Sequence, residues 1–453
     1  MVFKLQFLGG TGTVTGSKYL LTYNNKKILI DCGLFQGLKN LRLKNWEPFP
    51  IQPAEVDAII LTHAHIDHSG YIPRFVKEGF RGKIYATPAT RDLCAILLAD
   101  CGYLQEEEAT YLNKNKYTKH SPALPLFTIQ DAEYSMKYFE ILSFGTHKKL
   151  DDQIGFQFQY AGHILGAASV IIHMGSKKIA FTGDVGRFED HILYDPENLP
   201  AIDYLVTEST YGNKLHPKID VLSELEKIIH ETYSKGGVLL IPAFAIGRAM
   251  SMVRYLAILK KQNRIPSFPM FLNSPMAVDF SEIFFRYSEL HKLTQDECRE
   301  VSNVVQYIRS TDESIRLNNQ KGPMLIISAS GMMSGGRILH HLKSFAPNPT
   351  TTIAITGFQP AGTRGQSLEN GAPEIKIHGE YIPVRCKIKK LDISAHADYG
   401  ELIQWFAKSK IKPKKVFIVH GEPSASDEFR RRLEETFSWN CYVPDGSSFV
   451  NLE

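Results

Sequence analysis

Residues 61–70 read LTHAHIDHSG and place three histidines and one aspartate within six positions. They follow the apolar run VDAIIL at 56–61, which is typical of a buried β-strand. At the end of an extended strand, His63 and His65 point to the same side, whereas Asp67 and His68 come one turn later. The spacing predicts two metal half-sites from one short loop, so the chain needs a fold in which strands end at a metal pocket.

The predicted ligands offer nitrogen and oxygen rather than sulfur. The six cysteines are scattered without a C-x-x-C pair, which argues against both a disulfide framework and a zinc–thiolate site. Histidine with carboxylate is the ligand set of catalytic zinc, and manganese or iron also accept it. Solvated loop histidines are the alternative, but four ligand-type residues in six positions make that reading a poor one.

Three more ligand-type residues stand where later strand-like runs end. They are His163 in YAGHILGA, Asp184 in AFTGDVG and His420 in VFIVHGE. Small neighbours let other groups approach closely, and a carboxylate can bridge two metals about 3.5–4 Å apart. Polar residues flanked by glycine are common in turns, so the evidence lies in the repetition at strand ends.

The length of 453 residues predicts two or three domains. Apolar strands separated by helical stretches in the first third predict a sheet buried by helices. After Tyr211 a regular strand–helix alternation predicts a doubly wound α/β unit, and the first pattern returns near Cys386. We therefore predict a histidine-rich domain formed by 1–208 and 386–453, with an inserted domain at 209–385.

Charge is unevenly distributed along the chain. The net charge is +4, but residues 209–390 carry 23 Lys and Arg against 15 Asp and Glu. A basic domain suits a polyanionic partner.

No tract is apolar enough to cross a bilayer and the first residues lack a secretory pattern, so we expect no membrane partner and a cytoplasmic protein.

These motifs together resemble a known family. HAHIDH, with the later ligand-type residues, resembles the metallo-β-lactamase signature. The segments TEST, STYGNKLH, SASGMMSGG, TGFQPAGTRG and SAHAD resemble its β-CASP branch, whose members cut RNA or DNA. The nearest likeness is to the stand-alone RNA-cleaving type, related to the pre-mRNA 3′-end cleavage endonuclease subunit. The resemblance implies an α/β fold, a metallo-β-lactamase αββα sandwich with an inserted doubly wound α/β (β-CASP) domain.

The resemblance also implies two zinc ions per chain and their ligands. The first ion takes His63, His65, His163 and Asp184, and the second takes Asp67, His68, Asp184 and His420. Asp31 in ILIDCG matches the family's first aspartate, which orients the ligands from behind them. Without the resemblance, Asp31 reads as a turn aspartate at a strand end.

The implied activity is zinc-dependent hydrolysis of RNA phosphodiester bonds by a hydroxide held between two metals. His396 is the implied general acid and Glu208 its orienting partner, beside the catalytic carboxylates Asp67 and Asp184. Without the resemblance, His396 and Glu208 read as ordinary polar positions. Internal cleavage is favoured, while a 5′-exonuclease mode and a DNA substrate stay open.

Several residues are predicted to contact RNA phosphates. The Ser/Gly-rich turn before the helical run ILHHL exposes backbone N–H groups at a helix start. The predicted contacts are Ser330, Gly331, Gly335, Arg337, Arg248, Arg364 and Ser394. A plain helix start explains the turn equally, and a capping role explains Ser394.

Two rival functions remain at this point. One is a thioester or lactam hydrolase of the same fold, against which the long basic insertion argues. The other is a catalytically inactive RNA-binding subunit, against which the complete ligand set argues. A homodimer is compatible with the sequence.

Overall fold

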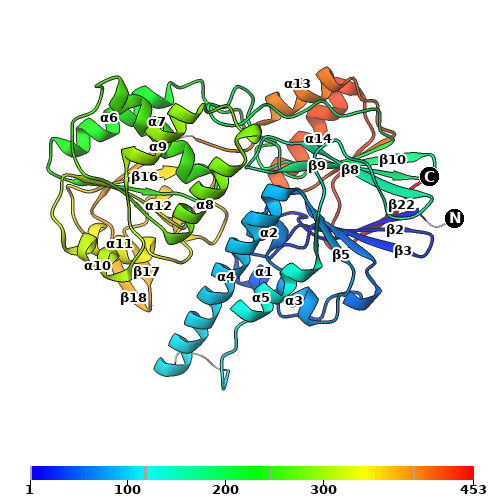
Figure 1. Ribbon diagram of the computed structural model, residues 1–453, viewed down its shortest axis with the longest axis horizontal. Coiled ribbons are helices and arrows are strands. Elements are labelled where there is room, and N and C mark those ends of the chain that lie inside the picture. Colours follow the sequence, from blue (N-terminus) through cyan, green and yellow to red (C-terminus); the bar gives the residue numbers. More distant parts are fainter. Residues whose placement is uncertain (1–2, 117–119, 245, 392) are drawn as a thin grey trace. The chain divides into compact units, whose positions relative to one another are not determined.

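The computed structural model describes residues 3–116, 120–244, 246–391 and 393–453 (Figure 1). The chain divides into two compact units, one formed by Met1–Leu215 with His396–Glu453 and the other by His216–Ala395. The sequence predicts 209–385 for the inserted domain. In the structure, β19 (Lys387–Leu391) pairs with β16 (Thr352–Thr356), so these later residues lie in the second unit's sheet.

The first unit contains two seven-stranded sheets. The first sheet has the order β22-β1-β2-β3-β4-β5-β6, with bounds Phe449–Asn451, Phe3–Gly9, Lys18–Tyr23, Lys26–Ile30, Ala58–Ile60, Lys83–Ala86 and Phe139–Ile141. The second has the order β21-β20-β11-β10-β9-β8-β7, with bounds Cys441–Tyr442, Lys415–Ile418, Tyr204–Thr207, Lys177–Phe181, Ala168–Met174, Ile154–Tyr160 and Lys148–Lys149.

The two sheets pack face to face around a shared hydrophobic core. Along β3, Ile28 and Ile30 point into this core together with Phe156 and Val170 of the second sheet. Leu29, between them, is also buried but outside this core, because successive strand residues point to opposite faces. Both faces of the first sheet are therefore covered, which explains its nearly continuous apolar strands.

Helices cover the outer faces of both sheets. The helices of this unit are α1 Lys39–Lys44, which buries no residue, and α2 Ile66–Ser69, α3 Ile72–Lys77, α4 Pro88–Asn115, α5 Ile129–Ser135, α13 Tyr399–Ser409 and α14 Pro423–Phe437. α13 and α14 pack on the second sheet, and Figure 1 shows α2 to α5 beside the first. These four layers confirm the predicted αββα sandwich. Within the described residues, no helix combines the length and the apolar character needed to cross a bilayer.

The second unit is built on a six-stranded sheet that is parallel throughout. Its order is β14-β13-β15-β12-β16-β19, and the first four strands span Gln306–Tyr307, Met270–Asn273, Met324–Ser328 and Val238–Pro242. The helices are α6 Val221–Tyr233, α7 Arg248–Lys261, α8 Pro275–Arg286, α9 Gln295–Val304, α10 Thr311–Asn319, α11 Ile338–Phe345 and α12 Arg364–Glu369, with a hairpin of β17 (Glu374–Ile377) and β18 (Glu380–Pro383). In Figure 1, α6 and α7 lie on one side of the sheet and α10 and α11 on the other, which confirms the predicted doubly wound α/β unit.

Parallel strand pairs bring the predicted site residues to one edge of the first unit. β3 runs parallel to β4, and β10, β11 and β20 run parallel to one another. Because the carboxyl ends of parallel neighbours meet at one edge, the residues that follow these strands converge there. Those residues are Asp31 after β3, His63 after β4, Asp184 after β10, Glu208 after β11 and His420 after β20.

A lysine is buried at the start of β2. Lys18 is 4 % exposed, and its Nζ lies 4.3 Å from the centre of the Phe35 ring. Its ammonium donates only a long bond, 3.4 Å, to the carbonyl oxygen of Gly16. Burial, partly opposed by Cys32, lowers the pKa of Lys18 to about 8. The folded protein therefore holds this amine in an environment that disfavours its charge.

We expect Lys18→Met to stabilise the protein at pH 7. The lowered pKa corresponds to at most about 3 kcal/mol of destabilisation when Lys18 is charged. Between about pH 8 and 10.5 the unfolded chain still holds a proton that the folded chain has released, so stability contributed by Lys18 rises with pH. Thermal unfolding of both proteins across this range checks the prediction. The variant's advantage should shrink towards pH 10.5, and parallel pH profiles would contradict it.

Candidate metal centre

The loop after β4 and the short helix α2 present four ligand-type side chains. His63 and His65 precede α2, and Asp67 and His68 lie on it. The backbone N–H of Cys32 donates to the carbonyl oxygen of His68 at 2.7 Å, which holds α2 against the strand end. Next to it, a Cβ at Gly33 would lie 1.6 Å from the carbonyl oxygen of Asp67, so only glycine allows this approach.

Three imidazoles and one carboxylate form the first cluster. Nδ1 of His65 lies 3.2 Å from Nε2 of His63 and 3.2 Å from Nε2 of His163. Oδ2 of Asp184 lies 3.5 Å from Nε2 of His63 and 3.6 Å from Nε2 of His163. Four ligand-type atoms from three separate chain segments therefore face a common centre.

The second cluster contains Asp67, His68 and His420. Nε2 of His420 lies 3.2 Å from Nε2 of His68 and 3.3 Å from Oδ2 of Asp67. Oδ1 of Asp184 lies 3.3 Å from Nε2 of His68 and 3.5 Å from Nδ1 of His420. The two oxygens of Asp184 thus face different clusters, which is the position of a bridging carboxylate.

Asp31 and Thr62 orient the imidazoles of His68 and His63 through contacts with the Nδ1 atoms of these rings. Oδ2 of Asp31 accepts a bond from Nδ1 of His68 at 2.7 Å, so Nε2 is the nitrogen that faces the second cluster. The backbone N–H of Thr62 donates to Oδ1 of Asp31 at 2.8 Å, and its hydroxyl donates to Oδ2 at 2.9 Å. The same hydroxyl oxygen lies 3.0 Å from Nδ1 of His63, so it links rings from both clusters to Asp31.

Burial and mutual interaction set the charges of the clusters. Burial lowers the pKa of His63, burial and neighbouring His63 lower that of His65 to about 3, and burial with His396 holds that of His163 well below its usual range. Burial opposes ionisation of Asp184, but His420 and His68 hold its pKa well below the usual value. At neutral pH the first cluster therefore offers neutral imidazoles and an ionised carboxylate, the protonation states that bind metals.

His68 differs from the other rings. Burial lowers its pKa, but the carboxylates of Asp184, Asp31 and Asp67 outweigh burial and hold it well above the usual value. The second cluster is therefore a region of negative potential that attracts positive charge.

His396 and Glu208 meet beside the first cluster. Nδ1 of His396 lies 3.2 and 3.1 Å from the two carboxylate oxygens of Glu208 and 3.9 Å from Oδ2 of Asp184. The Glu208 side chain is 1 % exposed and that of His396 is 13 % exposed, so a substrate reaches the histidine first. The backbone N–H of Ala397 donates to Val185 O at 2.8 Å, which fixes His396 against the segment that follows Asp184.

The tripeptide Glu208–Ser209–Thr210 connects this pair to His420. The Ser209 hydroxyl donates to the carbonyl oxygen of Val419 at 2.8 Å. Oγ1 of Thr210 lies 3.1 Å from Nδ1 of His420 and 3.3 Å from that residue's carbonyl oxygen. Three consecutive residues thus position His396, the end of β20 and the His420 ring.

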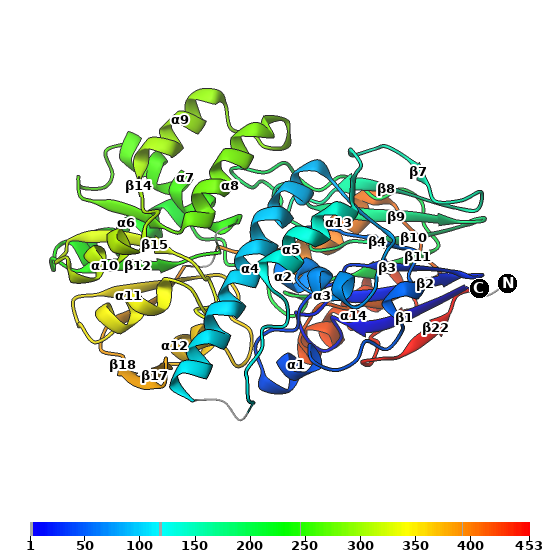
Figure 2. The same cartoon turned by 60° about the horizontal axis from the view of Figure 1, so that its bottom comes forward.

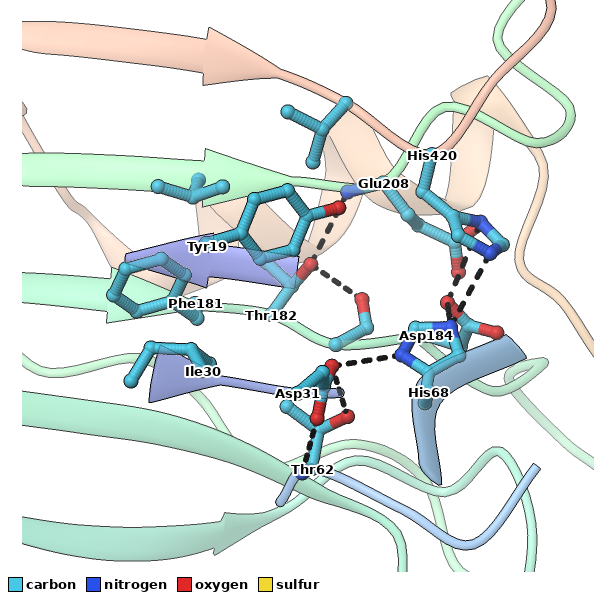
Figure 3. A pocket seen from close by; sticks show the side chains of 13 residues that line it. Tyr19, Ile30, Asp31, Thr62, His68, Phe181, Thr182, Asp184, Glu208 and His420 are labelled. Atoms are coloured by element: carbon cyan, nitrogen blue, oxygen red, sulfur yellow. Dashed lines mark hydrogen bonds and ion pairs between the residues drawn. The ribbon is translucent and has the colours of Figure 1, made fainter. Parts of the chain in front are cut away.

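A small cavity lies between the clusters and the sheets (Figure 3). In Figure 3 its polar side carries Asp31, His68, Asp184 and His420, whereas Tyr19 lies towards the strands. Burial raises the pKa of Tyr19, so its hydroxyl stays protonated at neutral pH. The side of the cavity towards the strands is therefore lined by uncharged side chains such as Tyr19, Ile30 and Phe181.

The predicted phosphate contacts lie in the second unit, and their arginines are already hydrogen-bonded to the protein. Arg337 donates to Asn273 Oδ1 at 2.8 Å and to Arg309 O at 2.6 Å. Arg364 donates to Lys376 O at 2.7 Å, and Arg248 donates to Thr356 O. These bonds brace strand ends and loops of the second unit, and phosphate binding by the three arginines stays a prediction.

Ser330, Gly331 and Gly335 occupy the loop before α11. Ser330 Oγ accepts a bond from the N–H of Ser334 at 3.1 Å, and Gly331 O accepts one from the Gln359 amide at 3.2 Å. Gly335 has open space where a side chain would stand. Ser394 is buried in the second unit.

Two contributors, Thr62 and Thr210, were missed by the sequence reasoning. Thr62 directly precedes His63, and Thr210 ends the segment TEST, so both positions lie inside the motifs. The signal that a hydroxyl was needed there is weak, because threonine is common at the ends of buried strands.

Three family models match consecutive parts of the chain. The Beta-lactamase superfamily domain matches residues 26–235, the Beta-Casp domain 249–368, and the Zn-dependent metallo-hydrolase RNA specificity domain 381–444. The first match includes the predicted ligands from His63 to Asp184, and the third includes His396 and His420.

The chain is also similar to several curated proteins along most of its length. It is 34 % identical to Ribonuclease TTHA0252 of Thermus thermophilus over 91 % of this chain and 92 % of that protein. It is 32 % identical to the RNase J-like protein of Methanocaldococcus jannaschii over 97 % of both chains. It is 30 % identical to the transcription termination factor FttA of the same organism over 97 % of this chain and 70 % of that protein.

A solved structure shares the fold. The crystal structure of a protein of unknown function from Enterococcus faecalis V583 matches along the full length of both chains, with a TM-score of 0.55 and 14 % identity.

Proposed function

Because this chain belongs to the β-CASP family of the metallo-β-lactamase superfamily, we propose that it is a zinc-dependent ribonuclease that hydrolyses phosphodiester bonds within RNA. Two of the similar proteins are named as ribonucleases, and the match to an RNA specificity domain supports RNA as the substrate. The observation that carries the proposal is the position of Asp184 between two ligand clusters, with His396 3.9 Å from its Oδ2.

The residues present fit zinc. Tetrahedral zinc with bonds of 2.0–2.1 Å places neighbouring ligand atoms about 3.3 Å apart. The first cluster has ligand-type atoms 3.2 to 3.6 Å apart, measured through His65 and Asp184. In addition, Oδ1 of Asp184 is buried and accepts no hydrogen bond from the described residues. A buried carboxylate oxygen without a hydrogen bond is costly unless a cation neutralises it.

We assign one ion to each cluster, with Asp184 shared between them. The first ion would be held by His63, His65, His163 and Asp184, and the second by Asp67, His68, Asp184 and His420. When bound, zinc supplies Lewis-acid charge that activates water as a nucleophile near neutral pH and offsets charge on phosphoryl oxygens. Manganese or iron would be held by the same nitrogen and oxygen atoms.

His396 supplies the proton that the departing sugar oxygen needs. Its Nδ1 faces the Glu208 carboxylate, so Nε2 is the nitrogen assigned to donate towards the substrate. The N–H of Val185 donates to Oε1 of Glu208 at 2.6 Å and keeps that carboxylate in place. Glu208 thus orients the ring of His396, and Asp31 does the same for His68.

Internal cleavage is the proposed mode, and release of 5′-terminal nucleotides is the alternative. The lactam-hydrolase rival is disfavoured because the curated relatives described above are named for RNA and transcription. The inactive-subunit rival is disfavoured because all seven ligand-type positions are filled by histidine or aspartate.

Metal removal is expected to abolish cleavage of end-labelled single-stranded RNA, and Zn²⁺ is expected to restore it. The wild-type protein, as purified, should contain two metal ions per chain by mass spectrometry and yield internal fragments. A chromogenic lactam serves as the comparison substrate and should remain intact. Mononucleotides released from the 5′ end would identify the exonuclease mode.

Two results would contradict this proposal. Undiminished RNA cleavage by metal-free protein would remove the metals from the reaction. Lactam hydrolysis without RNA cleavage would move the protein to the rival function. Sedimentation of the same preparation tests the homodimer that the sequence leaves open.

A further inference from the structure

The helix α1 lies on the surface of the first unit without a buried face. None of its residues is buried, although its sequence KNLRLK contains two leucines. Leu43 is 52 % exposed, and the nearby Trp46 is 49 % exposed. Figure 2 shows α1 at the periphery of the first unit. Exposed large apolar side chains gathered on one short segment are typical of a contact surface.

The segment that carries α1 is held in shape at its base. The side-chain amide of Asn45 donates to Phe35 O at 2.8 Å, and the N–H of Phe35 donates to Asn45 Oδ1 at 2.9 Å. Asn45 is itself buried. These paired bonds close the loop 35–45, so α1 projects from a fixed base rather than from a loose connection.

The same base is attached to the metal-ligand loop. The N–H of Leu34 donates to Ile66 O at 2.9 Å, beside the bond from Cys32 to His68 O. Lys39, the first residue of α1, is six residues from Gly33, a stretch that spans at most about 20 Å. A nucleic-acid strand bound at α1 is therefore within a few nucleotides of the clusters.

The charge of the segment identifies the chemistry of its partner. Lys39, Arg42 and Lys44 are exposed, and no acidic residue lies between Asp31 and Glu47. Nζ of Lys44 lies 5.5 Å from the centre of the Phe35 ring, so this cation already lies near an aromatic ring. Cations next to an exposed indole suit a single-stranded nucleic acid, whose phosphates bind the cations and whose bases stack on the ring. A second copy of the segment would instead bring like charges together.

We propose that Leu38–Trp46, which we call the basic arm, binds a single-stranded part of the RNA substrate beside the catalytic centre. A base stacks on Trp46, and phosphates pair with Lys39, Arg42 and Lys44. The basic arm increases the affinity for long RNA and takes no part in bond cleavage. This inference rests on the proposed ribonuclease function.

Tryptophan fluorescence tests the stacking directly. The chain has three tryptophans, and Trp405 and Trp439 are 0 % and 9 % exposed, so Trp46 dominates the response to an added oligonucleotide. We expect oligouridylate to quench the emission of the metal-loaded His396→Ala protein, which avoids cleavage during the titration. The additional change Trp46→Phe should abolish the quenching, and Trp46→Ala should weaken binding about tenfold.

Salt dependence tests the phosphate contacts. Replacing Lys39, Arg42 and Lys44 with alanine should reduce the slope of log K against log salt by about 2, because each phosphate contact contributes about 0.7 for single strands. The matched control replaces Lys408, Lys410 and Lys412, which are exposed elsewhere in the same unit. In the otherwise wild-type enzyme, the arm variants should raise KM for long RNA about tenfold and leave hydrolysis of bis(p-nitrophenyl) phosphate unchanged.

Three outcomes would contradict RNA binding by the basic arm and leave the ribonuclease proposal unaffected. They are equal salt slopes for the arm and control variants, quenching that survives Trp46→Phe, and arm-dependent binding to anionic lipid vesicles without binding to RNA. Thermal unfolding of each variant checks that the fold is retained. If no RNA is cleaved by any form of the enzyme, the proposed function fails, whereas binding by the basic arm is still measured by the fluorescence titration.

Discussion

Replacing His396 with alanine is expected to reduce RNA cleavage by about 10²–10⁴-fold while leaving the metal content unchanged. His396 contacts Glu208 and lies 3.9 Å from Asp184, but it is not among the residues that form either ligand cluster. Its loss should therefore remove proton donation and spare metal binding. Cleavage of end-labelled RNA and metal analysis of the same preparation measure both effects.

The leaving group distinguishes a general acid from a structural residue. A p-nitrophenolate departs without needing a proton, so His396→Ala should retain most of its activity towards bis(p-nitrophenyl) phosphate. His173→Ala is the matched control, since His173 lies in β9 with its ring against His147, and it should leave both activities intact. Equal losses with RNA and with the activated diester, or loss of metal, would remove His396 from the role of acid.

Asp184→Asn is expected to have the largest effect on metal binding. Both oxygens of this carboxylate face ligand-type nitrogens, one in each cluster. An amide keeps the size of the side chain but loses the negative charge, so both ions should bind more weakly. We expect at most one ion per chain after dialysis, an affinity loss above the 10–100-fold seen for outer partners, and no measurable RNA cleavage. Mass spectrometry and metal titration give these values.

Asp203→Asn provides the control for Asp184. Asp203 precedes β11 at the end opposite Glu208, where it accepts the N–H of Lys178 at 2.9 Å and pairs with Lys414. It carries the same charge in the same sheet, away from the clusters. Normal metal content in the Asp184 variant, or an equal loss in the Asp203 variant, would show that Asp184 does not join the two ions.

The ligand-type residues could be named from the sequence because they share a local rule. Each follows a strand of buried apolar residues, as His63 follows β4 and His420 follows β20. Such runs are recognised from a few residues alone. The parallel inserted sheet was expected from the strand–helix alternation after Tyr211. The αββα order, however, came from the family resemblance, since β11 and β20 pair across more than 200 residues of chain.

Contacts between side chains could not be predicted in the same way. The bond between Thr210 and His420, and that between Thr62 and Asp31, depend on how separate strands are placed in register. The boundary between α2 and α3 is a further example, because the chain turns at Gly70 and Tyr71 between these two helices. Local periodicity gives the type of element but not where a neighbouring segment interrupts it.

The arginines illustrate a second limit. Arg337 follows a Ser/Gly-rich turn and Arg248 follows a single glycine, each between a strand and a helix, a layout typical of phosphate binding. In the structure their guanidinium groups donate to Thr356 O and Arg309 O, respectively. The sequence pattern is the same for an arginine that stabilises a loop and for one that binds a ligand. Only the hydrogen-bond acceptors around the side chain in the structure distinguish the two.

The chain leaves the first unit shortly after Glu208 and returns to it at His396. The second unit begins at His216, eight residues after Glu208, and it ends at Ala395, directly before His396. Both covalent connections of the insertion therefore lie close in sequence to Glu208 and His396, the two residues to which we assign proton donation and its orientation.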